Sequence, residues 1–77
     1  MQIFLYQLRK EKGLTQKDIA DKLGISSVSY RNKEQSKNAF TQDEMFILSK
    51  FFRKSMHEIF YLVSNRNGNK KASTINL

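Results

Sequence analysis

The sequence predicts an all-α fold of five short helices in one small domain. Three observations support this prediction. Apolar residues recur at helical spacing, helix-capping residues precede several of the apolar segments, and the sequence lacks the sustained alternation that strands need. The chain has 77 residues without cysteine or proline, which is about the size of one domain with a single core.

The first predicted helix is amphipathic and ends at Gly13. Its apolar residues lie at positions i, i+1 and i+4, which places Phe4, Leu5 and Leu8 on one face. Glycine accepts the left-handed backbone conformation that closes a helix, and lysines in the last turn suit the negative end of the helix dipole. The helix is therefore expected to stop at this glycine.

A second helix is predicted over about 16–23. Thr15 is a suitable N-cap because its hydroxyl can accept a hydrogen bond from an unpaired amide of the first turn, and Asp18 adds negative charge to that turn. Gly24 ends the helix. The residues expected to be buried are Ile19, Ala20 and Leu23.

The third predicted helix spans about 26–33 and contains few apolar residues. Ser26 caps it, and only Val28 and Tyr30 are apolar enough to be buried. A helix with so little to bury is expected to act through its exposed face. Together with the preceding helix and the tight turn at Gly24, it predicts a helix-turn-helix, whose second helix lies in the major groove of DNA.

Two further helices are predicted after a loop over 35–40. Thr41 and Glu44 have the T-x-x-E spacing of a capping box, in which each residue's side chain accepts the other's backbone amide. Ser55 caps the last helix. The apolar residues of the two helices are Met45, Phe46, Ile47, Leu48, Phe51, Phe52, Met56, Ile59, Phe60, Leu62 and Val63.

The net charge of +7 is distributed unevenly along the chain. Residues 1–40 contain eight Lys and Arg against four acids, residues 41–63 contain three against three, and residues 64–77 contain three against none. A basic chain favours a polyanionic partner, and its cations are spread over several helices instead of lining one as membrane-surface helices require. We predict a DNA-binding domain over 1–63, a flexible basic tail over 64–77, and no membrane partner.

Catalytic and metal-binding functions have little support in the sequence. With no cysteine and a single histidine, His57, the chain offers no metal-ligand cluster and no nucleophile–base pair. Asp43 and Glu44 are adjacent carboxylates, but the capping box explains them. No stretch approaches the roughly 18 apolar residues of a membrane span. We expect a cytoplasmic, nucleoid-associated protein that is not an enzyme and has no metal, cofactor or small-molecule ligand.

An ordered set of residues with family-like spacing runs through most of the chain. It comprises Leu8-Arg9, Gly13-Leu14-Thr15-Gln16, Ile19-Ala20, Leu23-Gly24-Ile25-Ser26, Tyr30, Glu34 and the closing segment Ser55-Met56-His57-Glu58-Ile59-Phe60. This pattern, over about residues 3–62, resembles the Cro and phage-repressor type of helix-turn-helix regulator, also called the xenobiotic response element family. The resemblance implies a five-helix, lambda repressor-like domain of a bacterium or phage, with the helix-turn-helix in helices 2 and 3. Such a domain would bind a palindromic operator as a dimer and act as a small repressor.

The resemblance also implies roles for individual residues. The base-reading positions fall on the third helix, at Ser27, Val28 and Asn32 with Arg31 beside them. Their side chains suit base edges, because hydroxyl and amide groups can hydrogen-bond bases and a valine methyl suits thymine. The phosphate-contacting candidates are Gln16, Lys17, Ser26, Lys37 and Asn38. A structural ion pair falls on Arg9 and Glu34.

Several positions depart from the family pattern. Tyr30 replaces the usual aliphatic side chain, so its hydroxyl needs a partner or access to water. Lys33 occupies a position that is commonly apolar and is expected to be partly exposed. The loop over 35–40 lacks the glycine and proline that the family often has, which leaves its path and the contacts of Lys37 and Asn38 undetermined.

The fourth helix suggests a surface for a protein partner. Met45, Leu48 and Phe52 form one core-facing stripe, which leaves Ile47 and Phe51 on another face. We predict a homodimer through Ile47, Phe51, Tyr61 and Leu62, although a wide core face would explain the same residues. The alternative function is a protein-interaction module, antitoxin-like or a repressor's partner, that keeps this fold with weak or no specific DNA binding.

Overall fold

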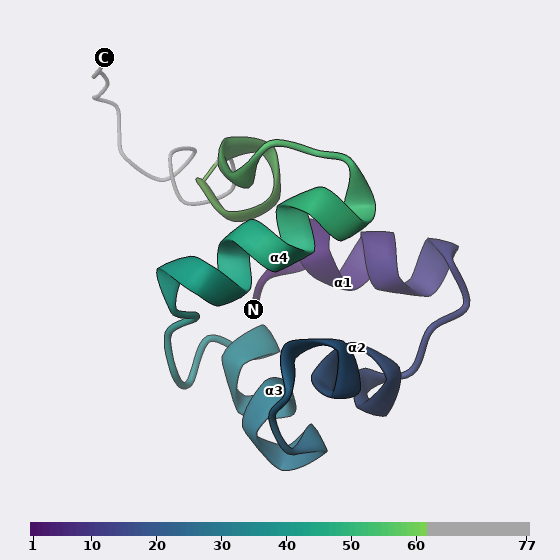
Figure 1. Cartoon of the computed structure of the whole chain (residues 1–77), viewed down its shortest axis with the longest axis vertical. Coiled ribbons are helices and arrows are strands. Elements are labelled where there is room, and N and C mark those ends of the chain that lie inside the picture. Colours follow the sequence, from purple (N-terminus) through teal and green to yellow (C-terminus); the bar gives the residue numbers. More distant parts are fainter. Residues whose placement is uncertain (62–77) are drawn as a thin grey trace.

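The computed structural model describes residues 1–61, apart from the side chain of Tyr61. Five helices and no strand make up this part of the chain: α1 (Ile3–Glu11), α2 (Gln16–Leu23), α3 (Ser27–Glu34), α4 (Gln42–Phe52) and the π-helical turn η1 (His57–Tyr61). Along the long axis of the molecule, α2 and α3 lie together at one end, η1 lies at the other, and α1 and α4 lie between them (Figure 1). The predicted all-α, five-helix fold is confirmed.

Reciprocal capping boxes fix the starts of three helices. At α2, the Thr15 hydroxyl accepts the Asp18 amide at 3.0 Å and the Asp18 carboxylate accepts the Thr15 amide at 2.9 Å. Thr41 and Glu44 form the box predicted at the start of α4, at 3.1 and 2.9 Å. A third box begins at Ser55. The sequence predicts the helix starts well because these contacts join residues only three positions apart.

The core lies where the five helices meet. Its buried residues are Leu5, Ile19, Ala20, Tyr30, Phe40, Leu48, Phe52, Ile59 and Phe60. Three of the rings form a continuous aromatic row, in which the centroid of Phe40 is 6.0 Å from that of Tyr30 and 5.4 Å from that of Phe60. This row connects α3 to η1 across the domain. Leu23, which was expected in the core, is only half-buried and packs at its edge.

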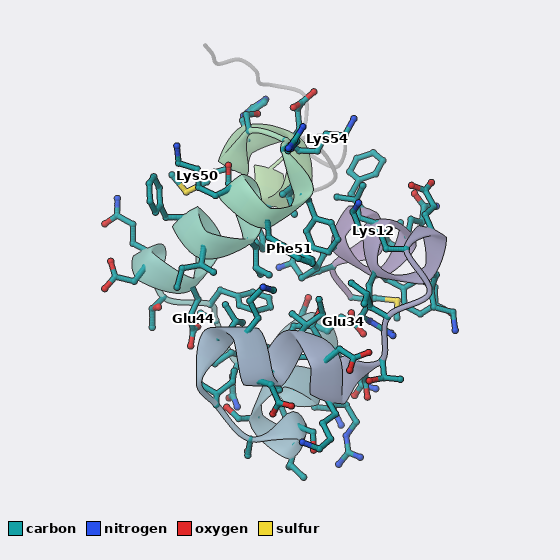
Figure 2. All side chains as sticks on the ribbon, turned by 45° about the vertical axis from the view of Figure 1, so that its right-hand side comes forward. Lys12, Glu34, Glu44, Lys50, Phe51 and Lys54 are labelled. Atoms are coloured by element: carbon teal, nitrogen blue, oxygen red, sulfur yellow. The ribbon has the colours of Figure 1, made fainter. Side chains whose placement is uncertain are left out.

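Phe51 is less exposed than the sequence predicts. Its ring packs edge-on against Phe52, with centroids 4.9 Å apart, and the Lys22 ammonium lies 4.4 Å from its centroid. Figure 2 shows Phe51 in the space between α4 and the other helices. Of the two residues predicted on this face, Ile47 is exposed, at 38%, and Phe51 is not. Phe46, next to Ile47, is exposed at 52%. Phe51 is therefore partly covered by the domain's own α2–α4 contact.

The last helix also differs from the sequence prediction. It is a five-residue π-helical turn, whereas a continuous amphipathic helix holding Leu62 and Val63 was expected. Those two residues, the Tyr61 side chain and the predicted tail over 64–77 lie outside the described residues. None of the helices over 1–61 has the length and apolar character needed to cross a membrane.

Candidate nucleic-acid interface

A rigid turn joins α2 to α3. Gly24 adopts the left-handed conformation with φ 73°, and the Ile25 amide donates to the carbonyl of Ala20 at 3.0 Å. Ala20 is fully buried where the two helices meet, and Ser26 then begins α3 by accepting the Ser29 amide at 3.0 Å. These local contacts fix the direction in which α3 leaves α2.

The two faces of α3 have opposite environments. On the inner face, Tyr30 and Glu34 are one turn apart and fully buried. On the outer face lie the four residues predicted to read bases: Ser27, Val28 and Arg31 are exposed, Val28 at 55%, and Asn32 is half-buried. Within residues 1–61, the polar side chains among these four have no hydrogen-bond or ion-pair partner. They are free to contact a ligand from one surface of the helix.

A network around the Glu34 carboxylate fixes the inner face. Oε1 accepts hydrogen bonds from Arg9 Nη2 at 3.1 Å and from Gln16 Nε2 at 3.0 Å. Oε2 accepts from Arg9 Nε at 2.8 Å and from the Tyr30 hydroxyl at 2.8 Å. Arg9 also donates through Nη1 to the carbonyl of Leu14 at 2.9 Å. This Glu34 network joins α1, the α1–α2 turn, α2 and α3 through one carboxylate.

The Glu34 network is charged although it is buried. Burial raises the pKa of Glu34, but the hydrogen bonds from Arg9, Gln16 and Tyr30 together outweigh it and hold the pKa below its ordinary value. The hydrogen bond to Glu34 raises the pKa of Arg9. Burial, with the neighbouring carboxylate, raises the pKa of the Tyr30 hydroxyl. At neutral pH the hydroxyl is therefore a donor and the carboxylate an acceptor only.

A second ion pair joins α3 to α4. Lys33 Nζ lies 2.7 and 2.8 Å from the two carboxylate oxygens of Glu44, and both side chains are mostly buried. Burial raises the pKa of Glu44. The hydrogen bonds from Lys33 and from the Thr41 amide lower it by a larger amount, so the pKa lies below the ordinary value. Lys33 is partly exposed, as the sequence predicts, but its ammonium is held in an ion pair that the sequence does not predict. The pair was missed because the capping box already explained Glu44. Glu34 and Glu44 both lie where the α2–α3 unit meets the rest of the domain (Figure 2).

Three of the phosphate candidates lie near the start of α2 or α3. Gln16 is the first residue of α2, and its side chain is held by a hydrogen bond to Glu34. Lys17 is exposed and pairs with Asp21 at 3.0 Å, a surface ion pair that constrains it weakly. The Ser26 hydroxyl caps α3 by accepting the Ser29 amide, as the sequence predicts, and its O–H is still able to donate to a phosphate oxygen.

The remaining two candidates follow the end of α3. The backbone amides of Lys37 and Asn38 both donate to the carbonyl of Asn32, at 2.8 and 3.3 Å. Ser36 adopts a left-handed conformation with φ 66°, which turns the chain back toward α3. The side chains of Lys37 and Asn38 are exposed, and these backbone bonds hold the segment beside the C-terminal end of α3.

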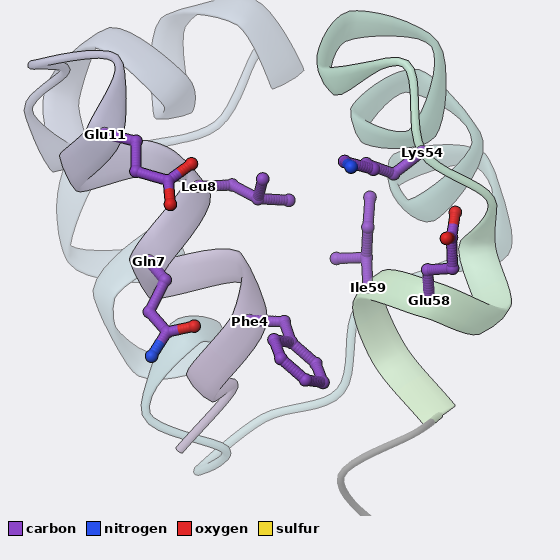
Figure 3. A pocket seen from close by; sticks show the side chains of 7 residues that line it. All are labelled: Phe4, Gln7, Leu8, Glu11, Lys54, Glu58 and Ile59. Atoms are coloured by element: carbon purple, nitrogen blue, oxygen red, sulfur yellow. The ribbon is translucent and has the colours of Figure 1, made fainter.

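Two surface hollows differ in the charge that they present. The hollow between α1 and η1 has an apolar floor of Phe4, Leu8 and Ile59 and a rim that includes Glu11, Glu58 and Lys54 (Figure 3). The hollow at the start of α2 is lined by Arg9, Lys10, Gly13, Leu14, Thr15 and Gln16. No carboxylate lines the second hollow, and although Glu34 neutralises Arg9, Lys10 leaves it positively charged, so it suits an anion better. Over residues 1–61, no group of three acidic or histidine side chains is placed to hold a metal ion.

Comparisons with known proteins identify one family. The sequence model described as helix-turn-helix, of the Cro, lambda repressor and xenobiotic response element type, matches residues 5–59. The match begins in α1 and ends in η1, so it includes α2, α3 and α4 in full and most of the other two helices. No curated protein and no solved structure matches the chain.

Proposed function

Since this chain belongs to the Cro and lambda repressor type of helix-turn-helix family, a family of DNA-binding transcription regulators, we propose that it is a sequence-specific repressor. The observation that carries the proposal is the division of α3 into a buried, anchored face and an exposed polar face. A helix presented in this way fits the major groove, where base edges carry a distinct pattern of donors and acceptors.

Each residue of the outer face has a suitable partner on DNA. Asn32 forms a bidentate contact with adenine, and Arg31 contacts guanine or a phosphate. Ser27 hydrogen-bonds a base edge, and the exposed methyl groups of Val28 pack against a thymine methyl. These contacts provide sequence discrimination, while contacts to phosphates fix the register of the protein on the duplex.

Phosphate contacts come from residues on both sides of the reading face. Gln16 and Lys17, at the start of α2, meet one phosphate where the helix dipole and unpaired amides favour an anion. Lys37 and Asn38 meet the backbone near the other end of α3. Ser26 donates its O–H to a phosphate oxygen, since the cap uses only a lone pair of the hydroxyl oxygen. The charge of +4 over residues 1–40, from eight Lys and Arg and four acids, supports this binding electrostatically.

A homodimer would read a palindrome with two copies of α3. Half-sites are then about 34 Å apart, one turn of DNA. The contact is proposed around Ile47 of α4, with the adjacent exposed Phe46 and with Tyr61 and Leu62. Phe51 has a smaller part, because its ring is largely used within the domain. Sedimentation of a monomer at tens of micromolar, with and without DNA, would exclude this dimer.

The proposal is tested by selecting bound sites from random DNA and titrating the selected duplex and a random duplex at two salt concentrations. A specific repressor binds its site at least about a thousand-fold more tightly than random DNA, and both affinities fall steeply with salt. Equal affinity for all sequences contradicts specific regulation. Failure to bind any duplex would instead favour the protein-interaction alternative.

A further inference from the structure

The carboxamide of Gln16 is not a free surface group. Its Nε2 donates to Glu34 Oε1 at 3.0 Å, across the junction between α2 and α3. A glutamine side chain that is fixed by folding has already lost the rotamer freedom that a free surface glutamine would lose on binding a ligand. Gln16 is therefore ordered before any ligand arrives.

The chemistry of Glu34 also fixes which way the carboxamide points. An ionised carboxylate accepts hydrogen bonds and cannot donate, so Gln16 must turn its NH₂ group, not its carbonyl, toward Glu34. One of the two Nε2 hydrogens is used in this contact. Within residues 1–61 the second has no partner, so it is available at the start of α2, beside the hollow that Lys10 lines. A phosphate oxygen is the acceptor that suits a donor in this place.

The Tyr30 hydroxyl completes the coordination of the same carboxylate. It donates to Oε2 at 2.8 Å from a ring that is fully buried in the core. A buried ring needs no hydroxyl for packing, and the family commonly has an aliphatic side chain here. Without the hydroxyl, a buried carboxylate oxygen would lose one of its two donors, and Arg9 or Gln16 would shift to replace it.

We propose that Tyr30 is a positioning residue for DNA binding, because its hydroxyl fixes Glu34, which in turn orients Gln16 toward a backbone phosphate. This inference rests on the proposed function for the ligand and deepens it by naming how one contact is preorganised. Its effect is independent of DNA sequence, since a phosphate contact reads no base.

The test compares Tyr30→Phe, Gln16→Ala and the double variant in binding a short duplex of random sequence at low salt. Tyr30→Phe is expected to weaken binding about three- to ten-fold, the range of one hydrogen bond, and Gln16→Ala to weaken it further. In the Gln16→Ala background, Tyr30→Phe should have no additional effect. Because Gln16 is uncharged, the slope of affinity against salt should stay the same.

Tyr6→Phe is the matched control, since it removes a hydroxyl from a half-buried ring on α1 whose hydroxyl does not bond the Glu34 network, and it keeps the ring whose centroid lies 5.4 Å from Arg9 Cζ. It should bind DNA as the parent chain does. Wild-type affinity of Tyr30→Phe, or an equal loss of affinity in both backgrounds, overturns the inference. A parent chain that binds no duplex overturns the proposed function instead.

Nuclear magnetic resonance of the free protein gives a readout that needs no DNA. The Nε2 proton of Gln16 that is bonded to Glu34 should be displaced from the position it has in a free carboxamide, whose two protons already differ. In Tyr30→Phe it should move toward the value of a free carboxamide, and in Tyr6→Phe it should not move. Unchanged Gln16 resonances in folded Tyr30→Phe would show that the hydroxyl does not control Gln16.

Discussion

The inner and outer faces of α3 are built for different tasks. Tyr30, Lys33 and Glu34 have partners on α1, α2 and α4, and two ion pairs hold the C-terminal end of the helix. Ser27 and Arg31, one turn apart on the outer face, have no side-chain partner within residues 1–61. An eight-residue helix with so few apolar residues is therefore held by buried polar contacts. Substitutions in it should divide into those that unfold the domain and those that change DNA binding alone.

The largest effect is expected from Glu34→Ala. This change leaves the Arg9 guanidinium buried without its carboxylate and removes the acceptor of Gln16 and Tyr30. Breaking one side of a buried pair typically costs about 3–5 kcal/mol in the free energy of unfolding, much of the stability of a small domain. Urea denaturation measures it. A loss below about 1 kcal/mol would mean that the network does not anchor α3.

A smaller loss is expected from Lys33→Met, which keeps the aliphatic length and removes the charge. Glu44 would then be mostly buried with only the Thr41 amide as a hydrogen-bond donor to its side chain. Leaving a buried acceptor undersatisfied costs about 1–3 kcal/mol. The matched control is Lys17→Met, since that lysine forms only an exposed pair worth about 0–1 kcal/mol. Equal losses in the two variants would contradict a structural role for the Lys33–Glu44 pair.

Acid is expected to destabilise the domain by protonating the buried carboxylates of Glu34 and Glu44. Glu34 and Glu44 have pKa values below their ordinary range in the folded chain, so the unfolded chain binds more protons as the pH falls. Their contribution is present above about pH 4.3 and is lost as the pH falls through the folded values, at about 1.4 kcal/mol per unit of pKa difference. Denaturation between pH 7 and pH 3 measures the loss. Glu34→Gln should flatten the dependence, and an unchanged pH profile in that variant would assign the acid sensitivity elsewhere.

The smallest effect is a gain in stability from Ser36→Gly. Ser36 holds a left-handed conformation with φ 66° just after α3, a conformation that costs a residue with a Cβ roughly 1 kcal/mol and glycine little. The free energy of unfolding should rise by up to about 1 kcal/mol. A decrease would mean that the greater freedom of glycine in the unfolded chain outweighs the relief of strain.

The sequence predicts the parts of this fold that depend on near neighbours. Thr15, Thr41 and Ser55 mark helix starts because a cap and its amide are three residues apart, and Gly24 marks a turn through its own backbone preference. The position of Arg9 opposite Glu34 comes from the family resemblance, since nothing in the local pattern joins residues 25 positions apart.

What the sequence does not predict depends on how the helices pack. Lys33 meets Glu44 only because α3 ends beside the start of α4, and the Tyr30 hydroxyl finds Glu34 only once the ring enters the core. Helical periodicity places Phe51 on an outer face, but Lys22 from α2 covers it. The base-reading residues of α3 come from the family resemblance, and the low apolar content of the helix predicts only that one of its faces is exposed.

The most direct test of the separation between the two faces is Asn32→Ala, measured for DNA binding and stability together. We predict that its affinity for the selected site falls by about 1–3 kcal/mol, that its affinity for random DNA changes little, and that its free energy of unfolding stays within about 0.5 kcal/mol of the parent. Equal losses of affinity on both duplexes, or a loss of stability like that of Glu34→Ala, would contradict the assignment of the outer face of α3 to base reading.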